Sequence, residues 1–343
     1  MADINRLVRE NVKALIPYSC ARDEFKGKDG IFLDANENPY GDLNRYPDPY
    51  QMELKAAISK IKGCPEENIF LGNGSDEIID LCFRIFCNPG TDKALTFTPT
   101  YGMYEVSAAI NDVQLVKIPL SDDFQIEYKS VLPELKDPAL KLIFICSPNN
   151  PTGNSMIGFE IESIISGFEG IVVIDEAYID FSDERSFKTM INRYNNLIVM
   201  QTFSKAMGLA AVRVGMAFMD PSMVLYFNKM KPPYNISTLN QEAALKSLKH
   251  IDLLKNNIDR IRKERERLAH TLEKMSIIEK VFPSDSNFLL VKTSNADMIY
   301  TELIHNKIIV RNRNKMVPGC IRITVGTERE NNKLISALQR INI

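Results

Sequence analysis

The chain has 343 residues, enough for about two domains of ordinary size, and its net charge of −2 gives no reason to expect nucleic acid or an acidic membrane as a partner. Six scattered cysteines without a Cys-x-x-Cys pair, and three histidines in polar surroundings, argue against disulfides and a metal site. The polar start lacks a signal peptide's apolar stretch, and no later apolar run is long enough to span a membrane. We therefore expect a cytoplasmic protein without a bound metal.

The N-terminal region is predicted to begin with a short amphipathic helix over residues 1–15, ended by Pro17. The stretch from residue 33 to residue 49 is rich in Asn, Asp, Pro and Tyr, which favour turns. Its composition leaves two interpretations open, a solvated surface loop or a fixed binding loop.

From about residue 51 to residue 230, apolar strands alternate with helices. This pattern is typical of an α/β domain with a mostly parallel sheet. Continuous apolar runs such as Leu142–Cys146 indicate strands that are buried on both faces. Strands are predicted at 69–71, 94–97, 113–118, 142–146, 171–178, 197–200 and 214–218, and helices at 51–62, 78–86, 102–110 and 158–167.

The C-terminal region is predicted to be a second domain, joined to the first by a long charged helical stretch over 238–275. Strands are expected at 287–291, 308–311 and 320–325, with helices at 296–306 and from 327. Arg311 ends a strand, and Arg322 lies between two apolar residues within one. Such an arginine pairs with a structural carboxylate or binds an anionic substrate, and the sequence leaves both possibilities open.

Several distinctive residues of the α/β region fall at or just beyond the ends of strands: Gly74, Tyr101, Asn150, Asp175 and Lys205. Ligands bind at the carboxyl ends of the strands in open α/β sheets. The shared location therefore predicts that these residues meet at one site.

The turn Gly72-Asn73-Gly74-Ser75 joins a strand to a helix, and a helix N-terminus offers unpaired N–H donors to a phosphate. Ser75 is expected to cap the helix, and the two acidic residues after it are expected to point away from a phosphate or to cap the helix. Position 77 is Glu where a dinucleotide fingerprint requires glycine, which argues against a nicotinamide enzyme. A plain tight turn remains the alternative.

The stretch 202–213 places two hydroxyls, a lysine, small residues and an arginine after a buried strand. Lys205 could form a Schiff base with an aldehyde, and Thr202, Ser204 and Arg213 could bind a phosphate. A buried Asp175 would need a partner, and a protonated pyridine nitrogen would serve. The alternative is a solvated lysine, which is commoner for a lone lysine in a loop.

The order of the motifs PTYGMYEVS, SPNNPTG, IDEAY, TFSKAMGLAAVRVG and IRITVGT resembles the fold-type I pyridoxal-5′-phosphate (PLP) aminotransferases, and within them the histidinol-phosphate branch. The resemblance implies an α/β large domain over 46–235, with a mostly parallel sheet flanked by helices, and a smaller α+β domain over 236–343. It also implies an arm over 1–45 that packs with the small domain and the partner subunit. A homodimer with shared active sites follows from the same resemblance.

The resemblance assigns roles around the cofactor ring. Lys205 matches the lysine that links PLP covalently and later moves the proton, and Asp175 matches the carboxylate paired with the ring nitrogen. Asn150 and Tyr178 match the groups that bind the ring's phenolic oxygen, and Tyr101 matches the aromatic residue stacked on the ring.

The resemblance also assigns the two anion sites. Ser75 stands where many relatives have a small residue such as alanine, so the role of its side chain stays open. The residues that match the family's cofactor-phosphate site are Gly74, Ser75, Ser204 and Arg213, with Thr202 beside them. Tyr46 matches a tyrosine that reaches the cofactor phosphate of the neighbouring subunit. Arg322 and Arg311 match the arginines that bind the anionic end of the substrate. The family's pocket also has Tyr18, Asn36 and Tyr234 nearby.

The implied reaction converts L-histidinol phosphate and 2-oxoglutarate into imidazole-acetol phosphate and glutamate, in histidine biosynthesis. Arginine forks bind phosphate and carboxylate alike, so one pocket can accept both substrates in turn. The alternatives are an aromatic-amino-acid aminotransferase, a threonine-phosphate decarboxylase and a non-catalytic regulator that keeps the fold.

Overall fold

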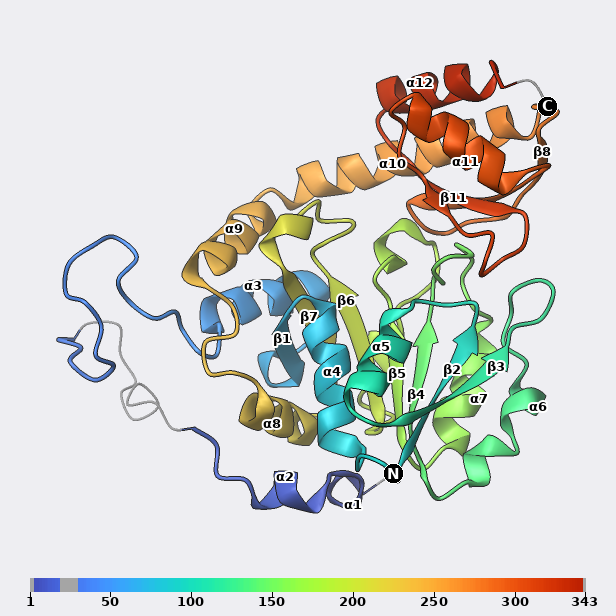
Figure 1. The fold of residues 1–343 in the computed structure, drawn as a ribbon. Helices are drawn as coiled ribbons and strands as arrows, with labels where there is room; N and C mark the ends of the chain where they lie inside the picture. The colour runs from blue at the N-terminus through green and yellow to red at the C-terminus, as the bar shows by residue number, and fades with distance from the viewer. Residues whose placement is uncertain (1–2, 19–29, 342–343) are drawn as a thin grey trace.

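The computed structural model describes residues 3–18 and 30–341, and it contains two sheets, of seven and four strands (Figure 1). The larger sheet has the order β1-β7-β6-β5-β4-β2-β3. Only β7 runs antiparallel to its neighbours in this sheet, so the predicted mostly parallel arrangement is confirmed. The strands are β1 (Ile69–Asn73), β2 (Lys93–Thr98), β3 (Gln114–Pro119), β4 (Leu140–Cys146), β5 (Ile171–Asp175), β6 (Leu197–Thr202) and β7 (Val214–Phe218).

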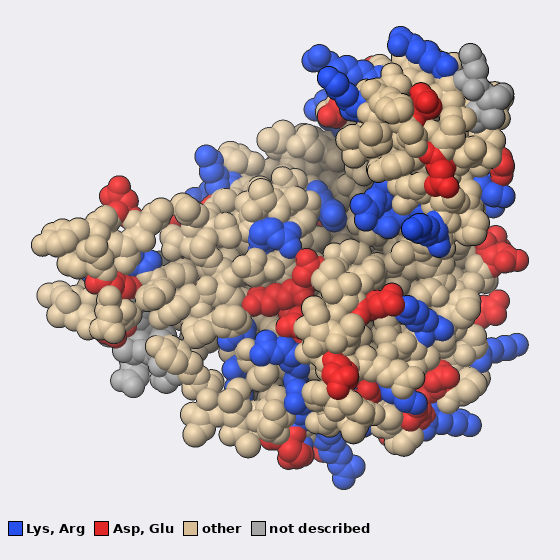
Figure 2. Space-filling model, in the orientation of Figure 1, with Lys and Arg blue, Asp and Glu red and all other residues tan. Residues whose placement is uncertain are grey.

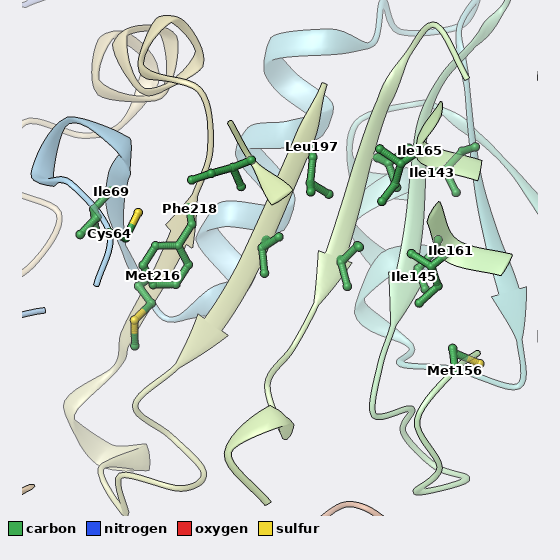
Figure 3. Packing of buried hydrophobic residues seen from close by; sticks show 14 of the residues in the cluster. Cys64, Ile69, Ile143, Ile145, Met156, Ile161, Ile165, Leu197, Met216 and Phe218 are labelled. Carbon is green, nitrogen blue, oxygen red and sulfur yellow. The ribbon is translucent and has the colours of Figure 1, made fainter. Parts of the chain in front are cut away.

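The central strands are buried on both faces because successive side chains of a strand point to opposite sides. In β5, Val172 and Ile174 belong to one apolar cluster, and Ile171 and Val173 belong to the other. Figure 3 shows side chains of the first cluster projecting from the strands of the larger sheet. This two-sided burial leaves the strand ends as the place where polar side chains meet a ligand.

Helices cover both faces of the larger sheet. One face is covered by α3 (Met52–Lys62), α7 (Gly158–Gly167) and the short α6 (Tyr128–Val131), whose apolar side chains belong to the first cluster. The other face is covered by α4 (Ser75–Phe86), α5 (Met103–Ile110) and α8 (Pro221–Met230). The α4 helix begins at Ser75 with Gly74 as its N-cap, without a capping side chain, so the predicted capping role of Ser75 was wrong.

The smaller sheet is antiparallel throughout, in the order β10-β11-β9-β8. Its strands are β8 (Ile278–Val281), β9 (Phe288–Thr293), β10 (Arg311–Asn312) and β11 (Cys320–Thr324). The helices α10 (Ile251–Leu272), α11 (Ala296–His305) and α12 (Glu328–Leu338) supply leucines and isoleucines to its core. The expected long charged helix is divided, because Lys249 and His250 separate α10 from α9 (Thr238–Leu248).

The strand predicted at 308–311 is shorter, and β8 was not predicted. The backbone N–H groups of Lys307 and Ile308 donate to Ile304 and Leu303, at 2.9 Å and 2.8 Å, and Lys307 has a φ of 58°. This left-handed residue closes the end of α11 and ties the apolar run to the helix. Strand pairing therefore starts only at Arg311.

The predicted helix over 1–15 consists of two short helices, α1 (Ile4–Leu7) and α2 (Glu10–Ala14). Between them Arg9 is extended, its N–H donates to the carbonyl of Ile85 (3.0 Å) and its Nη1 donates to that of Arg84 (2.9 Å). These bonds to the end of α4 replace the bonds of a continuous helix.

The described part of the N-terminal arm packs on the larger domain. Ile4, Val8 and Val12 belong to the same cluster as α4 and α8. The expectation that the arm packs with the small domain was therefore wrong for these residues. The segment from 30 to 45 projects from the side of the larger domain (Figure 1).

Candidate active site

A cavity of about 380 Å³ lies between the carboxyl ends of the larger sheet and the smaller lobe. Figure 2 shows Lys and Arg side chains around the hollow where the two lobes meet. Most of the predicted site residues line this one cavity: Ser75, Tyr101, Asn150, Asp175, Tyr178, Thr202, Ser204, Lys205, Arg213, Arg311 and Arg322.

One end of the cavity is formed by Gly74 and Arg213. The N–H of Gly74 donates to the carbonyl of Arg213 (2.9 Å), which extends the β1–β7 pairing by one residue. Gly74 has a φ of 75°, and a Cβ there would lie 2.5 Å from Nη2 of Arg213. Arg213 itself is left-handed, with a φ of 53°, a conformation that costs energy for a residue with a side chain. Only glycine at position 74 therefore leaves room for this guanidinium group.

Asp76 points into the cavity and not away from it, so the expectation for this residue was wrong. Its Oδ2 accepts from Nη2 of Arg213 (3.2 Å), and its Oδ1 accepts from the hydroxyl of Tyr101 (3.1 Å). Glu77 does point away, since its Oε2 accepts from the N–H of Asn73 (2.5 Å) and from Nδ2 of Asn235 (2.8 Å). Asp76 thus connects the arginine to the aromatic wall of the cavity.

Asp175 ends β5 at the floor of the cavity and is 3% exposed. Its Oδ2 accepts from the hydroxyl of Tyr104 (2.8 Å), and its Oδ1 accepts from the N–H of Ala177 (3.1 Å). Burial raises the pKa of this carboxyl, and the two donors oppose the rise. Sequence reasoning missed Tyr104, which lies in the first turn of α5, although its ring contacts that of Tyr101 edge-on with centres 5.7 Å apart.

Lys205 also lines the cavity and lies beside Tyr178, with Nζ 5.7 Å from the centre of the tyrosine ring. Burial and the nearby Arg322 lower the pKa of this amine, while Asp175 opposes the shift. Nδ2 of Asn150 donates to the hydroxyl of Tyr178 (3.4 Å). A lysine with a lowered pKa is more readily neutral, which proton transfer and attack on a carbonyl require.

The smaller sheet and the loop after its strand β10 contribute arginines to the cavity. Arg311 and Arg322 face each other across β10 and β11, and Nη1 of Arg322 donates to Oδ1 of Asn150. Arg313 also lines the cavity. Sequence reasoning missed Arg313 because it falls in the polar loop after the predicted strand, and only alternation with Arg311 could have indicated it.

The remaining predicted residues lie outside the cavity of this chain. Tyr46 stacks on Tyr234, with ring centres 4.4 Å apart and an angle of 11° between the rings. Tyr46 also lines a surface hollow together with Asn36. Tyr18 is 73% exposed and lies near Tyr50 in a separate small pocket. The roles expected for these residues at the active site of a neighbouring subunit therefore stay predictions.

The chain belongs to the family of class I and II aminotransferases, whose family model matches residues 28–338. It is 48% identical to a curated histidinol-phosphate aminotransferase of Cytophaga hutchinsonii, over 98% of each chain. Among solved structures, it resembles the histidinol-phosphate aminotransferase of Clostridium acetobutylicum (26% identity, TM-score 0.80, covering 87% of this chain and 90% of that one). It also resembles the Sinorhizobium meliloti enzyme in complex with PLP (25% identity, TM-score 0.80, 87% and 83% covered).

PLP is the cofactor of this family, and the cavity fits it. The cradle formed by Gly74 and Arg213 at the N-terminus of α4 suits a phosphate dianion, with Ser204 and Thr202 on the adjoining wall. The buried Asp175 carboxylate suits a protonated ring nitrogen, and Lys205 suits the aldehyde.

Two absences hold for residues 3–18 and 30–341. No group of three or more His, Cys, Asp and Glu side chains there could hold a metal ion. No helix in that part of the chain has the length and apolar character needed to cross a membrane.

Proposed function

We propose that the chain is a histidinol-phosphate aminotransferase, which moves the amino group of L-histidinol phosphate to 2-oxoglutarate in histidine biosynthesis. The observation that carries this proposal is one cavity that is lined by Lys205 and also by Arg311 and Arg322. An amine for the chemistry and guanidinium groups for an anionic tail are what both substrates need. The family membership and the curated relative support the same activity.

When bound, PLP supplies an aldehyde and a ring that withdraws electrons from the carbon bearing the substrate amine. Lys205 would take the proton from that carbon and deliver it to the carbon that bears the cofactor's aldehyde. The lowered pKa of the lysine favours the neutral form that can accept the proton. Asp175 would hold the ring nitrogen protonated. Asn150 and Tyr178 would bind the phenolic oxygen, and Tyr101 would stack on the ring.

The cofactor phosphate would be held by Arg213, Ser204, Thr202 and the amides at Gly74 and Ser75. Arg322 and Arg311 would bind the substrate's phosphate in one half-reaction and a carboxylate of glutamate in the other. Both anions are planar or tetrahedral oxygen clusters that a guanidinium fork can bind through two hydrogen bonds.

The assembly and the compartment belong to this proposal. We propose a cytoplasmic homodimer in which an arm over 1–45 approaches the partner, with a large domain over 46–235 and a small domain over 236–343. Exposed apolar side chains of the arm region support an interface there, with Ile31, Leu33, Tyr40 and Leu43 each more than 60% exposed. Tyr46 would reach the partner's cofactor phosphate, and Tyr18, Asn36 and Tyr234 would complete the substrate pocket across the interface.

The test is an absorbance titration of the PLP-loaded protein. L-Histidinol phosphate is expected to bleach the band of the lysine-bound cofactor, and 2-oxoglutarate is expected to restore it. A band that responds to phenylalanine and ignores histidinol phosphate would favour the aromatic alternative. Release of carbon dioxide from threonine phosphate would favour the decarboxylase, and a protein that takes up no PLP would exclude the enzyme.

A further inference from the structure

Three guanidinium groups line the same cavity as Lys205. Arg311 and Arg322 are paired residues of β10 and β11, and Arg313 follows two positions after Arg311. The backbone of Arg313 is fixed, since its N–H donates to the carbonyl of Cys320 (3.0 Å) and its carbonyl accepts from Met316 (2.8 Å). Like charges placed so close destabilise a sheet unless a counter-charge joins them.

No carboxylate of the described chain compensates this cluster. The Nε atoms of Arg313 and Arg322 are buried and have no hydrogen-bond partner among the described residues. Burial and the two neighbouring arginines lower the pKa of Arg313 to about 10, and the Tyr178 hydroxyl is the one nearby group that opposes the shift. Buried charges are normally paired, so an uncompensated cluster at the edge of a ligand cavity indicates an anion site.

The number of arginines bears on which anion is favoured. A carboxylate carries one negative charge and two oxygens, and a single guanidinium fork can satisfy it. A phosphate monoester carries close to two charges above pH 6 and presents three acceptor oxygens. Two guanidinium groups balance that charge, but Nη1 of Arg322 already donates to Asn150, so a third fork supplies donors that the three oxygens can still accept.

We propose that Arg313 is a specificity-determining residue that favours a substrate ending in a phosphate monoester over one ending in a carboxylate. This inference rests on the proposed function, because it concerns the substrate tail bound in the same cavity as Lys205. Arg311 and Arg322 serve both anions. Arg313 adds a third charge and further donors, which attract a dianion with three oxygens more strongly than a carboxylate with one charge. Its effect is expected mainly on KM, since the tail is remote from the reacting carbon.

The test compares Arg313→Gln with the wild type as PLP-loaded enzymes. In the variant, kcat/KM for L-histidinol phosphate is expected to fall about 30-fold, as for loss of a charged hydrogen bond, mostly through KM. The kcat/KM for glutamate is expected to change less than about threefold. Arg313→Lys keeps the charge and loses the fork, so its kcat/KM for L-histidinol phosphate should lie between those of the wild type and Arg313→Gln. Arg329→Gln, an exposed substitution in α12, is the matched control.

Phosphate binding gives a second readout that does not depend on histidinol phosphate. Inorganic phosphate is expected to inhibit the glutamate half-reaction, with an inhibition constant about tenfold higher in Arg313→Gln than in the wild type. An equal loss for both amino donors, or unchanged selectivity and unchanged phosphate inhibition, would overturn the proposal. If wild-type enzyme ignores histidinol phosphate, the proposed function fails, and phosphate inhibition still decides the role of Arg313.

Discussion

The hydroxyl of Tyr104 donates to Oδ2 of Asp175 across 2.8 Å, and this bond joins the first turn of α5 to the end of β5. Tyr104 is fully buried, so no water replaces the bond if the hydroxyl is removed. The bond keeps the pKa of Asp175 lower than burial alone would make it. Tyr104 therefore acts on the cofactor site through Asp175, as a positioning residue.

Tyr104→Phe should weaken both folding and cofactor binding. A hydrogen bond to a buried carboxylate contributes roughly 2 kcal/mol, so the cofactor-free variant should unfold at a lower urea concentration. PLP affinity should fall about tenfold, because Asp175 is less readily ionised beside the ring nitrogen. Tyr194→Phe, which removes a 2.9 Å bond to Glu162 outside the cavity, is the control. Equal PLP affinity in Tyr104→Phe and wild type would contradict the positioning role.

Gly74→Ala is expected to damage the phosphate cradle. The new Cβ would meet Nη2 of Arg213 at 2.5 Å, so the guanidinium group must move, and PLP affinity should fall by more than about tenfold. Gly63→Ala is the control for a carbon added at a positive φ, because Gly63 has a φ of 62° and nothing within 4 Å of the added carbon. Its ψ of 43° is left-handed helical, whereas Gly74 has a ψ of 168° in a region essentially confined to glycine, so more backbone strain is expected at position 74. Urea midpoints of the cofactor-free variants measure the strain at each position, and only Gly74→Ala should lose PLP, as measured by equilibrium dialysis. Similar losses in both would show that strain alone is responsible.

Lys205→Ala is expected to abolish turnover, since no other amine of the described chain lines the cavity. The phosphate cradle remains, so the variant should still take up PLP, which would then dialyse away faster than from the wild type. Lys129→Ala, an exposed lysine of α6, should retain both activity and cofactor. Normal turnover by Lys205→Ala would remove this residue from the proposed mechanism.

The sequence predicted the parts of the site that depend on local pattern. Asp175 and Lys205 could be placed because each follows a continuous apolar run, and such runs end at the same edge of a parallel sheet. Tyr104, Asp76 and Arg313 could not be placed in the same way. Their roles depend on side-chain direction, on the packing of α5 against β5 and on the short β10–β11 pairing, and these are contacts between distant segments.

Glu176, the residue after Asp175, is expected to make stability depend on pH. Burial raises the pKa of its carboxyl from 4.5 to about 7, although Ser186, Gln201 and the N–H of Phe187 all donate to it. Because the folded-state pKa is above the unfolded value, the favourable contribution is fully present below about pH 4.5. It is lost as the pH rises through about 7, where the folded protein must hold a buried charge.

Glu176→Gln should remove this dependence, since its neutral amide can donate to the buried Oε1 of Gln201, which has no partner among the described residues. Between pH 5 and 7.5, the wild type should lose roughly 2 kcal/mol of unfolding free energy relative to the variant, which is the part of the full shift in pKa that falls in this range. Urea midpoints of the cofactor-free proteins at the two pH values measure the difference. Glu184→Gln, an exposed carboxylate on the following loop, should parallel the wild type. If Glu176→Gln also parallels the wild type, Glu176 is ionised in the folded protein across this range, held by its three donors.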